Sequence, residues 1–388
     1  MNRPFRAALA ALCLIACAGC GTNGAVSAPP PQSSASASEE SPPPPPPTPE
    51  EIEERQLEEL LSSMTLEEQV GQLFFVRCPA SDAVEDVSAC HLGGYLLFGR
   101  DFQDKTAGDV VQTVASYQDA ARIPLLIGVD EEGGTVVRVS SNPHLRSSKF
   151  PSPQKLYASG GMEAVTAGTR EKDLLLSALG INVNFSPVAD VSLNPGDFIH
   201  DRSFGQDAPA TADYVAAVVS QMRSDGMGSV LKHFPGYGNN VDTHTGIAVD
   251  QRPLEAFRNS DFLPFSSGFD AGAGAVLVSH NIVTCLDETL PASLSPAVHQ
   301  ALRDLGFTGV AMTDDLAMEA VAAYSPGGAV AVMALQAGND MVVTTDYRTQ
   351  IPKVIEAVER GELDRSAVED ACRRVLQWKL SLGLLNFT

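Results

Sequence analysis

Eight short apolar runs recur along the chain, and each ends in, or is followed directly by, a charged, polar or glycine residue before a longer segment begins. Runs that are apolar at nearly every position are typical of strands buried on both faces, because neither face meets water. The longer segments between them, such as 210–225 and 295–305, carry the helical period of apolar residues. The eight runs are 72–77, 94–98, 124–130, 181–185, 229–233, 275–280, 310–314 and 340–344.

Eight buried strands separated by helices predict an α/β fold, built as a single (β/α)8 barrel of the TIM type. A doubly wound parallel sheet is the competing architecture. It is disfavoured because no G-x-G-x-x-G sequence follows the first strand and the chain contains no P-loop. The 26 Lys and Arg residues against 48 Asp and Glu give a net charge of −22, which argues against a nucleic-acid partner.

The first residues are typical of an export signal. Residues 1–19 combine Arg3 and Arg6 with an apolar stretch too short to span a bilayer. The stretch runs into Cys17 and Cys20, and both positions resemble a bacterial lipobox, in which cleavage leaves a lipid-modified N-terminal cysteine. We expect cleavage before Cys17, with Cys20 as the alternative and an ordinary secretory signal as the remaining interpretation.

A tether is expected between this signal and the barrel. Residues 20–51 are rich in Ala, Ser and Pro and contain six consecutive prolines at 42–47, so a disordered, extended linker is predicted. A short acidic helix over 50–63 follows, and Thr65 with Glu68 forms a capping pattern for the next helix. With the barrel over 52–388, we expect an extracytoplasmic monomer anchored to the bacterial cell membrane by lipid.

Charged and imidazole side chains stand where the predicted strands end. The carboxyl ends of barrel strands meet on one face, where the active sites of such barrels lie. His280 could line a pocket there or be a hydrogen-bonded core histidine, so we do not assign it a role. The strand-end residues are Asp130, Lys232, His233, His280, Asp314 and Asp315.

A glycine-rich segment after the fifth run, 232–238, leads to Asp242 and His244. A carboxylate two residues before an imidazole, together with the carboxylate of Asp314 on the barrel wall, suits acyl, phosphoryl or glycosyl transfer. No cluster of His, Asp and Glu has the spacing of a metal site, so neither a metal nor a cofactor is expected.

Four motifs in this order resemble glycoside hydrolase family 3, in its β-N-acetylglucosaminidase (β-N-acetylhexosaminidase) branch, over about residues 60–385. The loop before Asp242 is one residue shorter than the usual pattern, with Tyr237 where His is common and Thr243 where Ser is common. The motifs are Asp130-Glu-Glu-Gly-Gly134 with Arg138, Asp201-Arg-Ser-Phe-Gly205, Lys232-His-Phe-Pro-Gly236 with Asp242-Thr-His244, and Thr313-Asp-Asp-Leu316.

The resemblance implies a catalytic set. Asp314 resembles the nucleophile that forms a covalent glycosyl-enzyme, with Asp315 as the alternative. His244 resembles the general acid and base, and Asp242 the carboxylate that orients its imidazole. Five further residues resemble those that bind the sugar hydroxyls, although Arg138 and Arg202 could instead form structural ion pairs. They are Asp130, Arg138, Arg202, Lys232 and His233.

The function implied is exo-acting, retaining hydrolysis of terminal N-acetylglucosamine from cell-wall (peptidoglycan) or chitin-type fragments. A family 3 glycosidase of other sugar specificity, similar to the β-glucosidases, is one alternative, and a phosphorolytic variant is another. A catalytically silent binding lipoprotein is the third, and the intact motif residues argue against it. Cys78 and Cys90 belong to none of these motifs. They flank a polar stretch and are candidates for a disulfide, with free buried thiols as the alternative.

Overall fold

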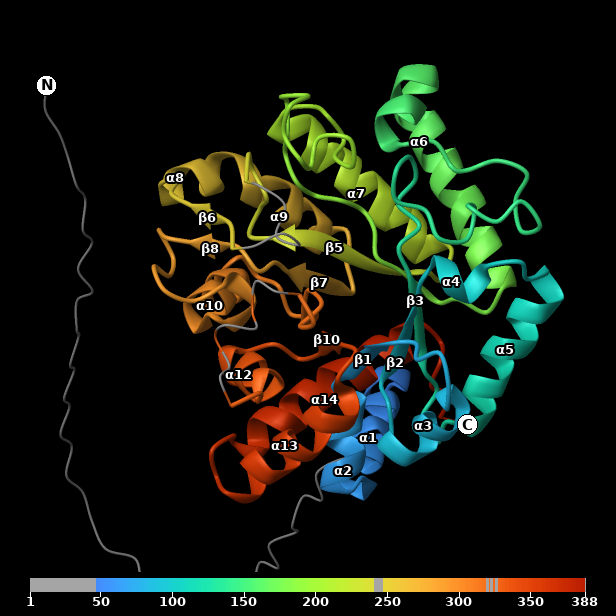
Figure 1. The fold of residues 1–388 in the computed structure, drawn as a ribbon, viewed down its shortest axis with the longest axis vertical. Helices are drawn as coiled ribbons and strands as arrows, with labels where there is room; N and C mark the ends of the chain where they lie inside the picture. The colour runs from blue at the N-terminus through green and yellow to red at the C-terminus, as the bar shows by residue number, and fades with distance from the viewer. Residues whose placement is uncertain (1–46, 241–246, 319–320, 322–323, 325–326, 388) are drawn as a thin grey trace, which may run out of the picture. The chain divides into compact units, whose positions relative to one another are not determined.

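The computed structural model describes residues 47–240, 247–318, 321, 324 and 327–387, and Thr48–Thr388 form one compact unit. Its parallel sheet runs in the order β10-β1-β2-β3-β4-β5-β7-β9, and a parallel bridge between Met312 and Met341 joins the two ends into a barrel (Figure 1). Each of the eight predicted runs coincides with one barrel strand, which confirms the fold class. The strands are β1 (Phe74–Arg77), β2 (Gly94–Leu97), β3 (Leu126–Val129), β4 (Val183–Asn184), β5 (Gly228–Phe234), β7 (Ala275–Val278), β9 (Val310–Thr313) and β10 (Val342–Thr344).

Helices follow the strands and lie around them (Figure 1). The predicted helical segments 210–225 and 295–305 correspond to α7 and α10. The longer helices are α1 (Pro49–Ser63), α2 (Leu66–Gln72), α3 (Ala83–Cys90), α5 (Ala107–Ala120), α6 (Pro153–Ala178), α7 (Ala208–Ser224), α9 (Phe262–Asp270), α10 (Pro296–Asp304), α12 (Val330–Ala337), α13 (Tyr347–Glu359) and α14 (Arg365–Ser381). Short turns of helix are α4 (Gly99–Phe102), α8 (Leu254–Ala256), η2 (Phe257–Asp261) and η3 (Ala292–Leu294).

The first two helices begin at local caps that the sequence specifies. The Thr65 hydroxyl accepts the Glu68 N–H (3.3 Å), and the Glu68 carboxylate accepts the Thr65 N–H (2.9 Å), as predicted. Thr48 and Glu51 form the same reciprocal cap at the start of α1. Helix α1 packs against α14, so the first and last helices of the unit lie side by side (Figure 1).

Aromatic rings fill the barrel interior. Phe75 of β1 and Phe185, which follows β4, meet edge to face with ring centroids 5.3 Å apart. Gly128 of β3 faces both rings, and a Cβ added there would lie 2.6 Å from Phe75 and 2.8 Å from Phe185. Glycine is therefore required at this position to leave room for the two rings.

A second, two-stranded sheet was not predicted. It pairs β6 (Val249–Asp250) with β8 (Ile282–Val283) in parallel, and each strand has only two residues. A pair of residues is too short to show the alternation by which strands are recognised in a sequence.

The expected disulfide is wrong, because Cys78 and Cys90 are both free cysteines. Cys78 follows β1 and is buried against α5, where its thiol donates to the Tyr117 hydroxyl (3.5 Å). Burial raises the pKa of this thiol to about 11. Cys90 ends α3 and is half-buried. The structure thus has the alternative, two free thiols.

A buried carboxyl group on α6 faces the end of α7. Both side-chain oxygens of Asp173 are buried, and the carboxylate of Asp225 is a neighbouring like charge to which the protonated Asp173 can donate a hydrogen bond. Burial, reinforced by Asp225 and opposed by the Lys172 cation, raises the pKa of Asp173 to about 7. The folded protein therefore holds a proton there that the unfolded chain releases near pH 4.

Replacing Asp173 with Asn should stabilise the protein at pH 8 and have little effect at pH 4. The free energy of unfolding of the wild type falls as the pH rises from about 4 to about 7, since the raised pKa favours folding only while the group is protonated. The full shift corresponds to about 4 kcal/mol above pH 7. Thermal unfolding between pH 4 and 8 measures the difference, with exposed Asp213 on α7, changed to Asn, as the control. A difference independent of pH would contradict this assignment.

Candidate active site

A cavity of about 450 Å³ lies at the carboxyl ends of the barrel strands. This is the end at which a parallel barrel exposes its loops and gathers catalytic groups. Six residues that the sequence predicted for the site line this cavity together with Asp315. They are Asp130, Arg138, Arg202, Lys232, His233 and Asp314.

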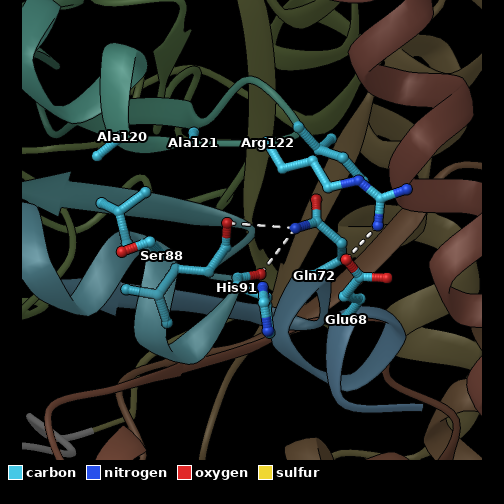
Figure 2. A pocket seen from close by; sticks show the side chains of 10 residues that line it. Glu68, Gln72, Ser88, His91, Ala120, Ala121 and Arg122 are labelled. Atoms are coloured by element: carbon cyan, nitrogen blue, oxygen red, sulfur yellow. Dashed lines mark hydrogen bonds and ion pairs between the residues drawn. The ribbon is translucent and has the colours of Figure 1, made fainter. Parts of the chain in front are cut away.

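A second, smaller cavity lies at the opposite end, where α2, α3 and the segment after α5 lead into β1, β2 and β3. It measures about 120 Å³, and none of the predicted site residues lines it. Figure 2 shows the Gln72 side chain donating to the backbone carbonyls of His91 and Leu92, and Arg122 paired with Glu68. These contacts link the segments that enter the barrel.

A network of alternating charges forms one wall of the catalytic cavity. The Lys232 ammonium lies 2.7 Å from Asp130 Oδ1 and 2.5 Å from Glu132 Oε1. The Arg202 guanidinium donates two hydrogen bonds to the Glu132 carboxylate, from Nε at 3.0 Å and from Nη2 at 2.8 Å. The sequence left two roles open for Arg202, sugar binding and a structural ion pair. The structure shows the ion pair, and Arg202 also lines the cavity.

Glu132 is the centre of this network, and the sequence analysis gave it no role. Its side chain is buried. Burial alone would raise its pKa, but Arg202 and Lys232 outweigh that effect and hold the pKa of Glu132 well below its usual range. Glu132 fixes two cations that line the cavity while it remains an anion.

Replacing Glu132 with Gln should cost about 3–5 kcal/mol of stability, because buried Lys232 and part-buried Arg202 lose their shared counter-charge. The KM for substrate should also rise, since Lys232 and Arg202 are no longer held in place. Urea unfolding and steady-state kinetics measure the two effects. Glu171, an exposed partner of Arg146 at 2.9 Å, supplies the control: Glu171→Gln should cost under about 1 kcal/mol. Equal costs for the two variants would contradict the proposed position of Glu132 in the network.

His233 is held in one tautomer by a second carboxylate that the sequence analysis missed, Asp190. Asp190 Oδ2 accepts from His233 Nδ1 at 2.7 Å, and its Oδ1 accepts the Tyr237 backbone N–H at 2.7 Å. On the other side of the ring, Arg202 Nη2 lies 3.2 Å from His233 Nε2. A guanidinium can only donate, so Nε2 accepts and the imidazole proton is on Nδ1. Asp190 thus joins the strand end to the loop that begins at residue 235.

Lys232 and His233 are neighbours on β5, yet both line the cavity. Consecutive residues of a regular strand point to opposite faces. The pairing of β5 with β7 loses its register between Leu231 and Phe234, so the regular alternation of side chains does not hold across these two residues.

Glu131 positions the loop that carries Arg138. Its buried carboxylate accepts the backbone N–H groups of Arg138 and Val139, both at 2.7 Å, and that of Ser140 at 3.2 Å. The Arg138 side chain, by contrast, is only loosely paired, with Nη2 3.7 Å from Asp130 Oδ2.

Asp314 and Asp315 follow β9 and both line the cavity. The Asp315 N–H donates to Asp314 Oδ1 at 2.8 Å, which orients the Asp314 carboxylate. Burial raises the pKa of Asp315, and the adjacent Asp314 charge adds to this. His280 is fully buried: its Nδ1 lies 2.7 Å from Ser293 Oγ and its Nε2 lies 3.0 Å from the Asp315 carbonyl. It is therefore a hydrogen-bonded core histidine that supports this turn.

Four predicted residues lie outside the described part of the chain: Asp242 and His244 of the loop, and Cys17 and Cys20 of the leader. Among the described residues, no group of three His, Cys, Asp or Glu side chains is arranged to hold a metal ion.

Comparison with known proteins identifies relatives over most of the folded unit. The model of the glycosyl hydrolase family 3 N-terminal domain matches residues 65–378. A β-hexosaminidase of Xanthomonas campestris is 34% identical over 284 residues, covering 71% of this chain and 84% of that protein. The β-hexosaminidase LpqI of Mycobacterium tuberculosis is 34% identical over 314 residues, covering 77% of this chain and 79% of that protein.

Solved structures share the barrel. The structure of M. tuberculosis LpqI superposes with a TM-score of 0.75 at 31% identity, over 83% of this chain and 96% of that one. A family 3 β-N-acetylglucosaminidase from Paenibacillus superposes with a TM-score of 0.76 at 28% identity, over 84% of this chain. The match spans 65% of the Paenibacillus chain, which continues beyond the shared part.

Proposed function

This chain belongs to glycoside hydrolase family 3, and we propose that it is an exo-acting, retaining β-N-acetylhexosaminidase that releases terminal N-acetylglucosamine from peptidoglycan or chitin-type fragments. It is a glycoside hydrolase with a carbohydrate substrate. The relatives named β-hexosaminidase and β-N-acetylglucosaminidase support the sugar specificity.

The observation that carries the proposal is the composition of the catalytic cavity. Asp314 lines a cavity of about 450 Å³ together with the charged and imidazole side chains of Asp130, Lys232, His233 and Arg202. Such a cavity has room for one sugar ring, and donors and acceptors in fixed positions can bind its hydroxyl groups. A cavity with room for one terminal sugar unit supports exo-cleavage.

The proposed reaction has two steps. The Asp314 carboxylate attacks the anomeric carbon while His244 gives a proton to the glycosidic oxygen, so the C–O bond to the leaving sugar breaks and a glycosyl ester of Asp314 forms. His244 then takes a proton from water, which attacks the same carbon and releases Asp314. Two inversions retain the β-configuration. Asp242 orients the imidazole and raises its basicity.

A panel of aryl glycosides tests the function. The wild type should release p-nitrophenol from the N-acetyl-β-glucosaminide far faster than from the β-glucoside, and the sugar should first appear as the β-anomer. A preference for the β-glucoside would favour the alternative sugar specificity. No release from any aryl glycoside would support the silent binding protein.

We also propose that the protein is anchored outside the cytoplasm by lipid at Cys17, or at Cys20. Among the described helices, none has the length and apolar character needed to cross a membrane. Because stable anchoring needs more than one acyl chain, a diacylglyceryl group on the N-terminal cysteine fits this requirement.

Replacing both Cys17 and Cys20 with Ser should move the protein from the membrane fraction to the soluble fraction. The aryl glycosidase activity serves as the readout for both fractions, and single Cys→Ser variants identify the modified residue. Membrane retention of the double variant equal to that of the wild type would exclude the lipid anchor.

A further inference from the structure

Two guanidinium groups and one aromatic ring form a second set of side chains in the catalytic cavity. Arg77 ends β1, Phe98 follows β2, and Arg138 comes from the loop after β3; all three line the cavity. Arg77 Cζ lies 4.1 Å from the centroid of the Phe98 ring, and Arg138 Cζ lies 5.5 Å from it. We refer to these residues as the Arg77–Phe98–Arg138 cluster.

The two arginines of this cluster have donors that the protein does not use. The Nε atoms of both Arg77 and Arg138 are buried, and neither has a hydrogen-bond partner within the described residues. Among the described residues, the carboxylate oxygen paired with Arg138 is Asp130 Oδ2 at 3.7 Å, which is too far for a hydrogen bond. A ring face attracts a cation but does not replace an acceptor in the guanidinium plane. Both side chains are part-exposed and line the cavity, so the terminal nitrogens of their guanidinium groups can donate to an acceptor that a ligand brings.

Neighbouring carboxylates are engaged elsewhere. Asp130 Oδ1 accepts from Lys232 at 2.7 Å, and Glu132 is gripped by Arg202 and Lys232. Asp315 accepts the Ala317 N–H at 2.9 Å, and the Arg77 cation acts on its carboxyl group through charge without forming an ion pair with it. The cluster therefore differs from the Lys232–Glu132–Arg202 wall, in which each cation has a close carboxylate.

We propose that the Arg77–Phe98–Arg138 cluster binds an oxyanion, a carboxylate or a phosphate, beside the sugar. This inference rests on the proposed function. Terminal N-acetylglucosamine is uncharged, so the oxyanion belongs either to the sugar that leaves or to free phosphate in the position of an acceptor. The planar fork of a guanidinium matches both groups, because each presents two oxygens at the right spacing.

The first arm of the test compares two disaccharides that share the terminal N-acetyl-β-glucosaminyl unit. One ends in N-acetylmuramic acid, which carries a carboxylate, and the other in its neutral carboxamide. The wild type should favour the acid in kcat/KM by about 10- to 100-fold, the usual effect of one charge-assisted hydrogen bond. Arg77→Gln should bring this ratio close to one, and Arg77→Lys should retain part of it.

The second arm measures phosphate. If the oxyanion is free phosphate, the wild type acting on an aryl N-acetyl-β-glucosaminide in phosphate buffer should form N-acetylglucosamine 1-phosphate. A phosphate oxygen then attacks the anomeric carbon, and the bond to Asp314 breaks. The yield, measured by phosphorus NMR, should fall at least tenfold in Arg77→Gln. Arg122→Gln, which alters the small cavity at the other end of the barrel (Figure 2), should behave as the wild type in both arms.

The outcomes separate this inference from the proposed function. If the wild type shows an acid-to-amide ratio near one and forms no sugar phosphate, the cluster is not an oxyanion site. The same conclusion follows if Arg77→Gln changes neither quantity. If the wild type cleaves no aryl N-acetyl-β-glucosaminide, the proposed function fails. Calorimetric titration of the wild type and Arg77→Gln with inorganic phosphate then still tests the oxyanion site. Phosphate binding that is present in the wild type and lost in Arg77→Gln supports the site. Equal binding by both proteins, or no binding by the wild type, overturns it.

Discussion

Changing Asp314 to Asn should lower kcat on an aryl N-acetyl-β-glucosaminide by about 10⁴- to 10⁶-fold, the range seen when a covalent catalyst is removed. The amide has no anionic oxygen to attack the anomeric carbon. Its carbonyl oxygen can still accept the Asp315 N–H, which Asp314 Oδ1 now accepts at 2.8 Å, so the turn after β9 is retained. Steady-state rates and the unfolding temperature of both proteins, measured together, separate lost chemistry from lost structure.

Asp315→Asn is the matched control, because both carboxylates line the cavity and they are adjacent in sequence. Burial raises the pKa of Asp315, which disfavours the ionised form that a nucleophile requires. We expect this variant to keep activity within about 100-fold of the wild type. A larger loss of kcat in Asp315→Asn than in Asp314→Asn would mean that Asp315 is the nucleophile.

The barrel could be predicted because its strands are local and continuously apolar. Residues 310–313, for example, are buried at every position, and the run is visible without any knowledge of its neighbours. Features that depend on pairing could not be predicted in this way. The two-residue strands β6 and β8 and the loss of register in β5 arise from contacts between distant segments.

The site was predicted to the extent that its residues stand at strand ends or within recognisable motifs. Asp130, Lys232 and Asp314 are of this kind, and the structure brings them to one cavity. Their supporting carboxylates were missed, because a partner is defined by space rather than by sequence. Glu132 meets Arg202 across 70 positions and Asp190 meets His233 across 43, and no local pattern marks either pair.

Arg77 is another cavity residue whose surroundings the sequence did not indicate. It is the last residue of an apolar strand and belongs to none of the four motifs. In a sequence, a single arginine at such a place resembles a solvated rim residue. Its contact with Phe98 and its buried Nε, which has no partner within the described residues, become apparent only once β1 and β2 lie side by side.

His244→Ala should lose about 10²- to 10⁴-fold in rate on a chitobiose-type substrate, which is the usual contribution of general acid–base catalysis. A sugar leaves as an alkoxide of high pKa and needs a proton, whereas nitrophenolate departs almost unaided. Formation of the glycosyl-enzyme from an aryl substrate should therefore slow far less than cleavage of the disaccharide. Rapid-quench measurement of the first turnover separates the two.

The second step gives this prediction its distinctive signature. The same imidazole activates water, so the glycosyl-enzyme of His244→Ala should accumulate, and an aryl substrate should show a burst of nitrophenol followed by a slow phase. Asp242→Asn should give a milder form of both effects, because it disturbs only the tautomer and the basicity of the imidazole. Equal losses on the two substrates without a burst would mean that another group donates the proton and that His244 only positions its loop. In that case the shortened segment between Gly238 and Asp242 would have displaced the imidazole from its role in the family.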